Sequence, residues 1–264
     1  MIGAIFGDIV GSIYEYHNIK TKDFELFSPK CRFTDDTVMS VAVADALMQY
    51  EKIEDIEDFK RTLIESMHKY GKMYPRAGYG MHFGLWLMLG ETEPYGSYGN
   101  GSAMRVSPAA WYASSLDEAI SLAQATAEVT HNHPEGIKGA VVSAGAAYLA
   151  RTGADKEQIR EFVCKYYDMD FTLDGIRDSY YFNETCQETV PQAMQAFFEA
   201  TSFEDAIRNG ISIGGDSDTL CAICGGVAEA FWGMTEEEKD LAKSYLDEPL
   251  LCVVESFESK IKAK

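Results

Sequence analysis

The sequence predicts an all-α protein, and three observations support that prediction. Apolar residues recur at helical spacing through most of the 264 residues. Several of these segments follow a Ser or Thr with acidic residues directly after it, which is the usual start of a helix. The sequence contains no alternating run of apolar and polar residues long enough for a half-buried strand.

Helices are expected, in chain order, at 3–15, 36–50, 55–72, 80–90, 103–113, 116–129, 134–152, 155–166, 185–200, 203–212, 217–232, 235–246 and 248–262. Ser115, Ser202 and Thr235 precede three of them, and acids follow in each first turn, where they favour the helix dipole. The run Val38 to Met48 is apolar on nearly every side, so it is expected to be buried. The segment MHFGLWLML, residues 81–89, is likewise expected to be a core helix. Loops are predicted at 17–34, 91–102 and 167–184.

Composition favours one domain over residues 1–264. Hydrophobic residues make up 46% of the chain, which is enough for one substantial core. No Pro/Ser-rich linker separates two compositional regions, and no repeat of helical units is visible. The segments AVVSAGAAYLA and CAICGGVAEA are rich in small residues, which let central helices approach closely.

Charge and leader content exclude several functional classes. The formal net charge is −19, which argues against sequence-independent binding to nucleic acid or anionic lipid. A small anionic ligand stays open, because a site can carry its own cations. The N-terminal MIGAIFGDIVGS has no basic leader, and no apolar stretch is long enough to span a bilayer. With six scattered cysteines, a reduced cytoplasmic protein is expected.

Two clusters of aspartate stand directly in front of apolar helices. FTDDTVMS contains Thr34, Asp35 and Asp36, and GGDSDTLCAICGG contains Asp216, Asp218 and Thr219. Helix capping explains one oxygen of each cluster, but not several acids that point toward apolar helices. Adjacent carboxylates repel, and four of them would balance two divalent ions. Oxygen ligands suit Mg²⁺, Mn²⁺ or Ca²⁺ rather than zinc, so a dinuclear site between two helix N-termini is predicted.

The loop SYGNGSAMRVSP, residues 97–108, is the third feature. Gly99 and Gly101 flank Asn100, and Ser102 precedes a helix. Successive backbone N–H groups in such a loop can cradle a phosphate, although the same composition is typical of ordinary turns.

At these residues the sequence resembles the ADP-ribosylglycohydrolase family. The matching segments are GDIVGSIYEY, FTDDTVMS, SYGNGSAMRVSP, THNHPEG and ISIGGDSDTLCAICGG, in family order between residues 7 and 226. The resemblance implies a compact orthogonal helical bundle with a dinuclear Mg²⁺ or Mn²⁺ centre in a cleft. It implies hydrolysis of a glycosidic bond at the ribose C1″ of an ADP-ribosylated protein or small molecule, releasing ADP-ribose.

The resemblance also assigns roles to individual residues. The implied metal ligands are Thr34, Asp35, Asp36, Asp216, Asp218 and Thr219. Glu15 is the implied proton-transfer residue, with Asp35, Asp36 or Asp218 orienting the attacking water. The implied substrate-binding residues are Ser97, Tyr98, Gly99, Asn100, Gly101, Ser102 and His131. An aromatic covering the adenine is expected among Tyr180, Tyr181 and Phe182.

Two alternatives of other classes stay open. The chain could be a non-catalytic, metal-dependent ADP-ribose or nucleotide sensor, or a dinuclear phosphohydrolase that cleaves the diphosphate.

Two local motifs give weaker evidence about function. The pair His131 and His133 lacks a second Cys/His pair for zinc, so a helix start or a ligand contact is expected there. Cys221 and Cys224 fall inside a predicted helix, where two buried small residues are expected rather than a redox pair.

Overall fold

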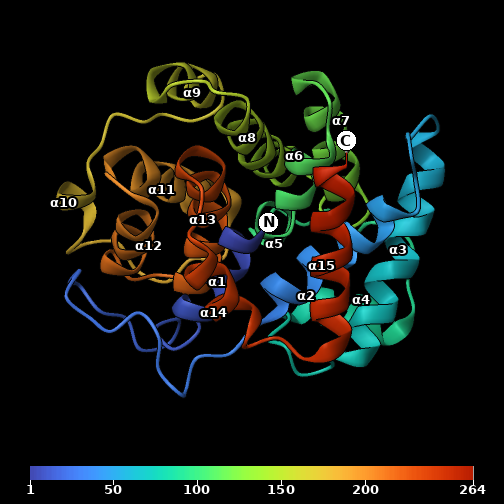
Figure 1. Cartoon of the computed structure of the whole chain (residues 1–264), viewed down its shortest axis with the longest axis horizontal. Coiled ribbons are helices and arrows are strands. Elements are labelled where there is room, and N and C mark those ends of the chain that lie inside the picture. The colour runs from blue at the N-terminus through green and yellow to red at the C-terminus, as the bar shows by residue number, and fades with distance from the viewer. Residues whose placement is uncertain (264) are drawn as a thin grey trace.

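The computed structural model describes residues 1–263 and is built from helices (Figure 1). They are α1 (Ile2–Gly11), α2 (Asp35–Met48), α3 (Ile56–Met73), α4 (Met81–Leu89), α5 (Gly101–Met104), α6 (Ser107–Tyr112), α7 (Leu116–Glu128), α8 (Pro134–Arg151), α9 (Lys156–Val163), α10 (Leu173–Ile176), α11 (Cys186–Glu199), α12 (Phe203–Ser212), α13 (Ser217–Trp232), α14 (Glu236–Lys243) and α15 (Glu248–Lys262). Within this range the only β pairing is an isolated bridge between Gly99 and Thr185. The all-α prediction is confirmed.

Helices α1 and α13 form the centre of the molecule, and glycines bring them together. Gly3, Gly7 and Gly11 are spaced four residues apart along one face of α1. A Cβ on Gly7 would lie 2.0 Å from the carbonyl oxygen of Cys221, and one on Gly11 would lie 2.5 Å from the Cα of Asp218. The two backbones are therefore in direct contact, and no larger residue fits between them.

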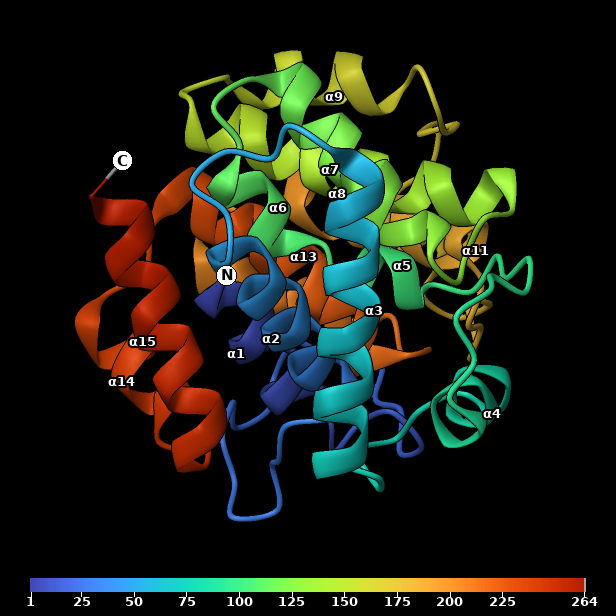
Figure 2. The ribbon, with the colours of Figure 1, turned by 90° about the vertical axis from the view of Figure 1, so that its right-hand side faces the viewer.

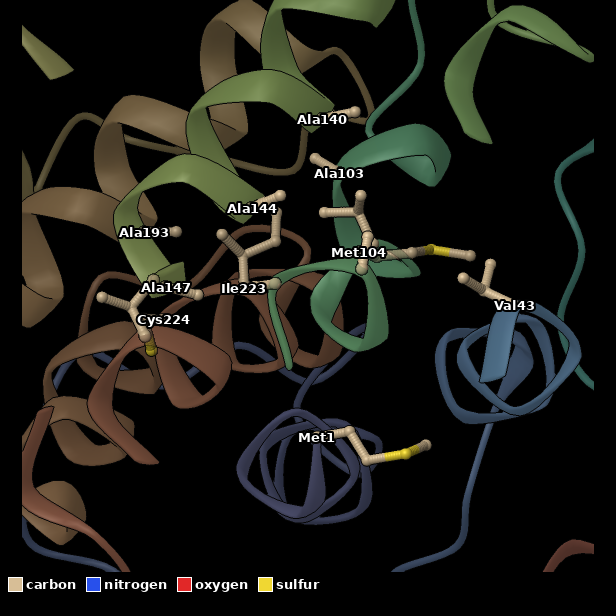
Figure 3. Close-up of a cluster of buried hydrophobic side chains, with 14 of the residues drawn as sticks. Met1, Val43, Ala103, Met104, Ala140, Ala144, Ala147, Ala193, Ile223 and Cys224 are labelled. Carbon is tan, nitrogen blue, oxygen red and sulfur yellow. The ribbon is translucent and has the colours of Figure 1, made fainter. Parts of the chain in front are cut away.

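The remaining helices surround this pair. Figure 2 shows α3 running alongside α2, with α14 and α15 on the opposite side from α4. In the core cluster of Figure 3, small side chains pack among larger ones. Figure 3 shows Met104 of α5 reaching toward Val43 of α2, while Ala144 and Ala147 of α8 lie beside Ile223 of α13. Buried residues from Met1 to Phe257 form one continuous cluster, and the assignment to one domain stays a prediction. Within residues 1–263, no helix is both long and apolar enough to cross a membrane.

Most predicted helix starts are confirmed. The side chains of Ser115, Ser202 and Thr235 accept hydrogen bonds from the amides of Glu118, Asp205 and Glu238. Helix α2 is buried along almost all its length, as its apolar sequence predicted.

Four details of the predicted fold were wrong. The expected helix 3–15 ends at Gly11, and the expected helix 103–113 is divided into α5 and α6. Pro108 in the first turn of α6 has no amide proton to continue the α5 ladder, which explains the break. The short helix α10 lies inside the expected loop 167–184.

Helix α4 is the fourth correction, because it is only half buried. Phe83, Trp86 and Leu87 face the core. Met81, Met88 and Leu89 are 80%, 72% and 65% exposed. The segment is apolar on all sides, so its sequence gave no sign of which face would meet solvent.

Candidate active site

The two aspartate clusters meet at the starts of α2 and α13. Thr34 caps α2, and its Oγ1 lies 3.4 Å from the amide nitrogen of Asp36. Asp216 occupies the cap position of α13, and Asp218 and Thr219 lie in its first turn. Thr219 Oγ1 donates to Asp36 Oδ2 at 3.4 Å, which joins the two clusters directly. The predicted meeting of these two segments is therefore what the structure shows.

Asp8 is a member of the cluster that the sequence analysis missed. Its side chain is fully buried in the middle of α1. It accepts hydrogen bonds from the amide and hydroxyl of Thr34, at 2.9 and 2.6 Å, and from the amide and hydroxyl of Thr37, at 3.1 and 2.5 Å. The available signal was a single charge in the otherwise apolar segment of residues 2–11. Asp8 thereby ties α1 to the start of α2.

Two carboxylate triads share one residue. Asp8, Asp36 and Asp218 each place an oxygen within 4.8 Å of the other two, and Glu15, Asp216 and Asp218 do the same. Asp36 Oδ1 is buried and has no hydrogen-bond partner among the described residues. A buried carboxylate oxygen without a donor is costly unless a cation satisfies it. The residues present therefore fit divalent metal binding through hard oxygen ligands.

The raised pKa values of the clustered aspartates also favour a site for cations. Burial raises the pKa of Asp36 well above its ordinary value, and the charge of Asp8 raises it further. Burial, followed by repulsion from Asp216 and Asp36, raises the pKa of Asp218 in the same direction. Such shifts mean that the cluster without cations resists full ionisation, an effect that bound cations would reverse.

Asp35 and Thr34 differ from the other predicted ligands. Asp35 is half-buried and lines the cleft, but it belongs to neither triad. Its pKa is raised well above the ordinary range, first by burial and then by Asp8. Thr34 Oγ1 donates to Asp8 at 2.6 Å, so its hydroxyl proton is already used within the protein.

The carboxylates open into a cavity of about 420 Å³. Its walls are formed by acidic residues of the cluster, by the 97–101 loop and by the segment that precedes and begins α4. The lining residues are Glu15, Asp35, Asp36, Gly78, Gly80, Met81, His82, Phe83, Tyr95, Ser97, Gly99, Asn100, Gly101, Met104, Arg105, His131, Glu184, Asp216, Asp218 and Thr219. The wall thus has acidic oxygens on one part and aromatic rings on another.

Asn100 contacts the carboxylate cluster rather than only the open cavity. Its side-chain nitrogen donates to Asp216 Oδ2 at 2.7 Å and to Thr189 Oγ1 at 3.2 Å. Its backbone amide donates to the carbonyl oxygen of Glu184 at 2.8 Å. The residue therefore holds Asp216 in place as well as lining the cavity.

The other predicted substrate residues divide into two groups. Ser97, Gly99, Gly101 and His131 line the cavity with Asn100. The side chains of Tyr98 and Ser102 point elsewhere. Tyr98 is 47% exposed and its ring lies 5.2 Å from that of His133. Ser102 is buried and donates to the carbonyl oxygen of Gly136 at 2.7 Å.

The turn before Asp216 requires glycine and is clamped by an asparagine. Gly214 and Gly215 have φ values of +69° and +82°, which other residues rarely adopt. The side-chain amide of Asn18 donates to the carbonyl oxygen of Gly215 and accepts from its amide, both at 2.8 Å. Asn18 falls in a predicted loop, and no sequence signal singled it out.

Glu15 lies at the edge of the cluster, beyond the end of α1. It is half-buried and lines the cavity. Burial raises its pKa, a hydrogen bond with Tyr16 opposes this, and the charge of Asp216 raises it further. A carboxyl group with a raised pKa is suited to proton transfer near neutral pH.

None of the three aromatic candidates lines the cavity. Tyr180 packs over Gly215 and donates to the carbonyl oxygen of Glu188 at 2.6 Å. Tyr181 is 75% exposed, and Phe182 stacks on Tyr16 with ring centroids 5.8 Å apart. The aromatic rings of the cavity wall come from Phe83 and Tyr95 instead.

In the two local motifs of lower weight, His133 and the cysteine pair have structural roles. His133 caps α8, where its Nδ1 accepts from the amide of Glu135 at 3.1 Å. The thiols of Cys221 and Cys224 are buried in α13 and donate to carbonyl oxygens of α12 at 3.5 Å each.

Fold and site together define an all-helical protein whose cleft gathers oxygen donors at the starts of two central helices. The chain matches the model of the ADP-ribosylglycohydrolase family over residues 1–252. It is 23% identical to human ADP-ribosylhydrolase ARH3, across 89% of this chain and 85% of the relative. It is 26% identical to the ADP-ribosyl-[dinitrogen reductase] glycohydrolase of Rhodospirillum rubrum, with 89% and 85% covered.

A third relative is the ADP-ribosylarginine hydrolase Tri1 of Pseudomonas putida, 25% identical over 89% of this chain and 70% of the relative. Among solved structures, an ADP-ribosylglycohydrolase-related protein complex shares the fold with a TM-score of 0.62, at 20% identity and with 98% and 97% of the chains covered. The chain belongs to the ADP-ribosylglycohydrolase family and is a glycosidic-bond hydrolase. The family resemblance seen in the motifs is confirmed.

Proposed function

We propose that this enzyme hydrolyses the glycosidic bond at the ribose C1″ of an ADP-ribosylated protein or small molecule and releases ADP-ribose. The observation that carries the proposal is the pair of carboxylate triads that share Asp218 in the cleft wall, the second of which includes Glu15. The named relatives act on ADP-ribosyl groups, which supports the same class of substrate here.

Two Mg²⁺ or Mn²⁺ ions are the proposed cofactors. Asp8, Asp36 and Asp218 would hold one, and Asp216 and Asp218 the other, with Asp35 and Thr219 as further oxygen donors. When bound, divalent cations supply positive charge that orients sugar hydroxyls and lowers the pKa of water.

Side chains of the protein are proposed to carry out proton transfer, orient the water and stabilise the transition state. The proposed role of Glu15 is to transfer a proton at the scissile bond, because its raised pKa and its place beside Asp218 suit a group that holds and releases a proton. Asp35, half-buried at the cavity wall, is proposed to orient the attacking water. Nearby carboxylates stabilise the positive charge that develops at C1″ in an oxocarbenium-like transition state.

The rest of the substrate is proposed to lie along the opposite wall. The backbone from Ser97 to Gly101 and the ring of His131 would receive the diphosphate. Phe83 or Tyr95 would cover the adenine, in place of the aromatics expected from sequence. A cytoplasmic location is retained as part of the proposal, supported by the six cysteines, all of which are free.

The test is product release from a panel of ADP-ribosyl conjugates on arginine, serine and small metabolites, with and without Mg²⁺ or Mn²⁺. Release of intact ADP-ribose that depends on the cation and is lost in Asp218→Asn supports the proposal. Binding without release would indicate a sensor, and release of AMP would indicate a phosphohydrolase. Either of these two results overturns it.

A further inference from the structure

A buried cation without a carboxylate partner lies in the cavity wall. Arg105 is 1% exposed and lines the cleft, yet no ion pair within residues 1–263 includes it. Its Nη2 donates to the carbonyl oxygen of Thr126 at 2.7 Å and to Thr130 Oγ1 at 2.8 Å. A guanidinium group has donors only, so the direction of both hydrogen bonds is fixed.

The hydrogen bond from Arg105 also fixes the direction of the hydrogen bond between Thr130 and His131. Its side chain is fully buried, and its Oγ1 lies 2.7 Å from Nδ1 of His131. Because Thr130 Oγ1 accepts from Arg105, its own proton needs an acceptor, and a buried hydroxyl rarely goes without one. In the described chain, the only acceptor recorded within reach is Nδ1 of His131.

We propose that Arg105 and Thr130 are positioning residues that fix the proton of His131 on Nε2, so that the histidine presents one N–H donor to the ligand. Nε2 faces the glycine loop, because a Cβ on Gly101 would lie 3.2 Å from it and a Cβ on Gly99 3.5 Å. No protein acceptor of this N–H is recorded for residues 1–263.

The charge states agree with this arrangement. Burial lowers the pKa of Arg105 to about 10, so the guanidinium stays charged at neutral pH. Burial, and then the charge of Arg105, lowers the pKa of His131 well below its usual value. His131 is therefore neutral, with a single ring proton whose position decides whether the cavity sees a donor or an acceptor.

The consequence for ligand choice rests on the proposed function. An Nε2–H donor between Gly99 and Gly101 suits an oxygen acceptor such as a diphosphate oxygen. The reversed tautomer would present a lone pair to the same oxygen and repel it. Arg105 thus contributes to ligand recognition indirectly. It orients the hydroxyl of Thr130, which in turn sets the position of the proton on His131.

The first test reads the tautomer directly in the full-length protein without ligand. Nitrogen-15 NMR of the ring separates protonated from unprotonated nitrogens, and the loss of one histidine signal in His131→Gln assigns the resonances. The expected result is an unprotonated Nδ1 and a protonated Nε2. A proton on Nδ1 in the wild-type protein overturns the proposal, whatever the ligand.

The second test removes the hydroxyl group of Thr130, which connects Arg105 to His131. Thr130→Val keeps the branched shape and deletes the hydroxyl, so a mixed or reversed tautomer is expected, while Thr130→Ser should restore the wild-type spectrum. Thr126→Val is the matched control, because Thr126 is equally buried and its hydroxyl donates only to the carbonyl oxygen of Ala123, at 2.8 Å. An unchanged tautomer in a folded Thr130→Val protein overturns this role of Thr130.

Binding of ADP-ribose, measured by calorimetry, links the tautomer to recognition. Thr130→Val should weaken binding about fivefold to tenfold, the size of one lost hydrogen bond. His131→Gln, whose amide nitrogen takes the place of Nε2, should retain more affinity than His131→Asn. Equal affinities in all of these variants would overturn the recognition role. A wild-type protein that does not bind ADP-ribose would refute the proposed function while leaving the tautomer result intact.

Discussion

The side-chain amide of Asn100 donates a hydrogen bond of 2.7 Å to Asp216, at the start of α13. The residue expected from sequence to dock the diphosphate therefore also fixes a member of the carboxylate cluster. Asn100 thus connects the cavity wall to the carboxylate cluster.

Asn100→Ala should weaken cation binding as well as substrate binding. Without the amide, Asp216 loses a donor that favours its ionised form, so Mn²⁺ affinity measured by calorimetry should fall about threefold to tenfold. Ser97→Ala is the control, because Ser97 lines the same cavity and its recorded side-chain partner is the amide of Gly99. If both variants bind Mn²⁺ like the wild type, Asn100 only docks substrate.

Asp8→Asn and Asp218→Asn should affect stability differently in the presence of a chelator. Asp8 accepts four hydrogen bonds, and an amide in its place turns donors toward donors. A loss of about 2–4 kcal/mol in the free energy of unfolding is expected from urea titrations. Asp218→Asn removes a repelled charge, so the metal-free protein should lose no stability while its cation affinity falls. Similar losses of stability in both variants would contradict this division of roles.

Glu15→Gln should separate proton transfer from cation binding. The value of kcat should fall by about 10²–10⁴, the range for a lost general acid or base, while Mn²⁺ affinity stays close to that of the wild type. Glu184→Gln, at an exposed position of the same cavity outside both triads, is the matched control. Loss of one of two bound cations in Glu15→Gln would show instead that Glu15 is a ligand.

Gly7→Ala should destabilise the protein far more than the chemically identical Gly84→Ala. A Cβ at residue 7 would meet the carbonyl oxygen of Cys221 at 2.0 Å, so the two central helices must separate. A loss of about 3 kcal/mol or more is expected. At residue 84 the nearest atom would be 3.8 Å away, and alanine there should be neutral or stabilise α4 by about 0.5–1 kcal/mol. Chemical denaturation of both variants decides, and equal stabilities would contradict the close approach of α1 and α13.

His131 should make the protein less stable in mild acid. Burial holds its folded pKa below the unfolded value of about 6.5, so the unfolded chain binds the proton more readily. The stability that neutral His131 contributes is present above that value and is lost as pH falls toward the folded pKa. Arg105 and Tyr95 are the titratable groups beside the ring. His131→Gln should have a smaller drop in melting temperature than the wild type between about pH 7 and about pH 5. An equal drop would show that other groups titrate.

The sequence predicted those parts of the site that depend on local pattern. Asp35, Asp36, Asp216 and Asp218 could be found because capping positions, adjacent charges and family motifs all lie within a few residues. Asp8 was missed because its significance comes from Thr34 and Thr37, which reach it only after the chain has folded back.

Other features could not be predicted from the sequence for the same reason, because they depend on tertiary packing. Helix α4 is apolar on all sides, so only tertiary packing decides that Phe83 is buried while Met81 is exposed. Tyr98 and Asn100 are two residues apart in one motif, but their side chains face solvent and the carboxylate cluster respectively. A motif identifies a loop, whereas the direction of each side chain depends on the elements around it.

The glycine face of α1 also has a consequence for the choice of cation. Because Gly11 touches the backbone of Asp218, the separation of the helices that carry Asp8 and Asp218 is set by main-chain contact, not by adjustable side chains. Such a frame has little freedom to expand. Mg²⁺ takes six ligands in rigid octahedral geometry at about 2.0–2.1 Å, whereas Ca²⁺ takes six to eight oxygens at about 2.3–2.6 Å. With the proposed cations bound, discrimination by ionic radius would follow from this backbone contact, which holds the proposed ligand Asp218 directly.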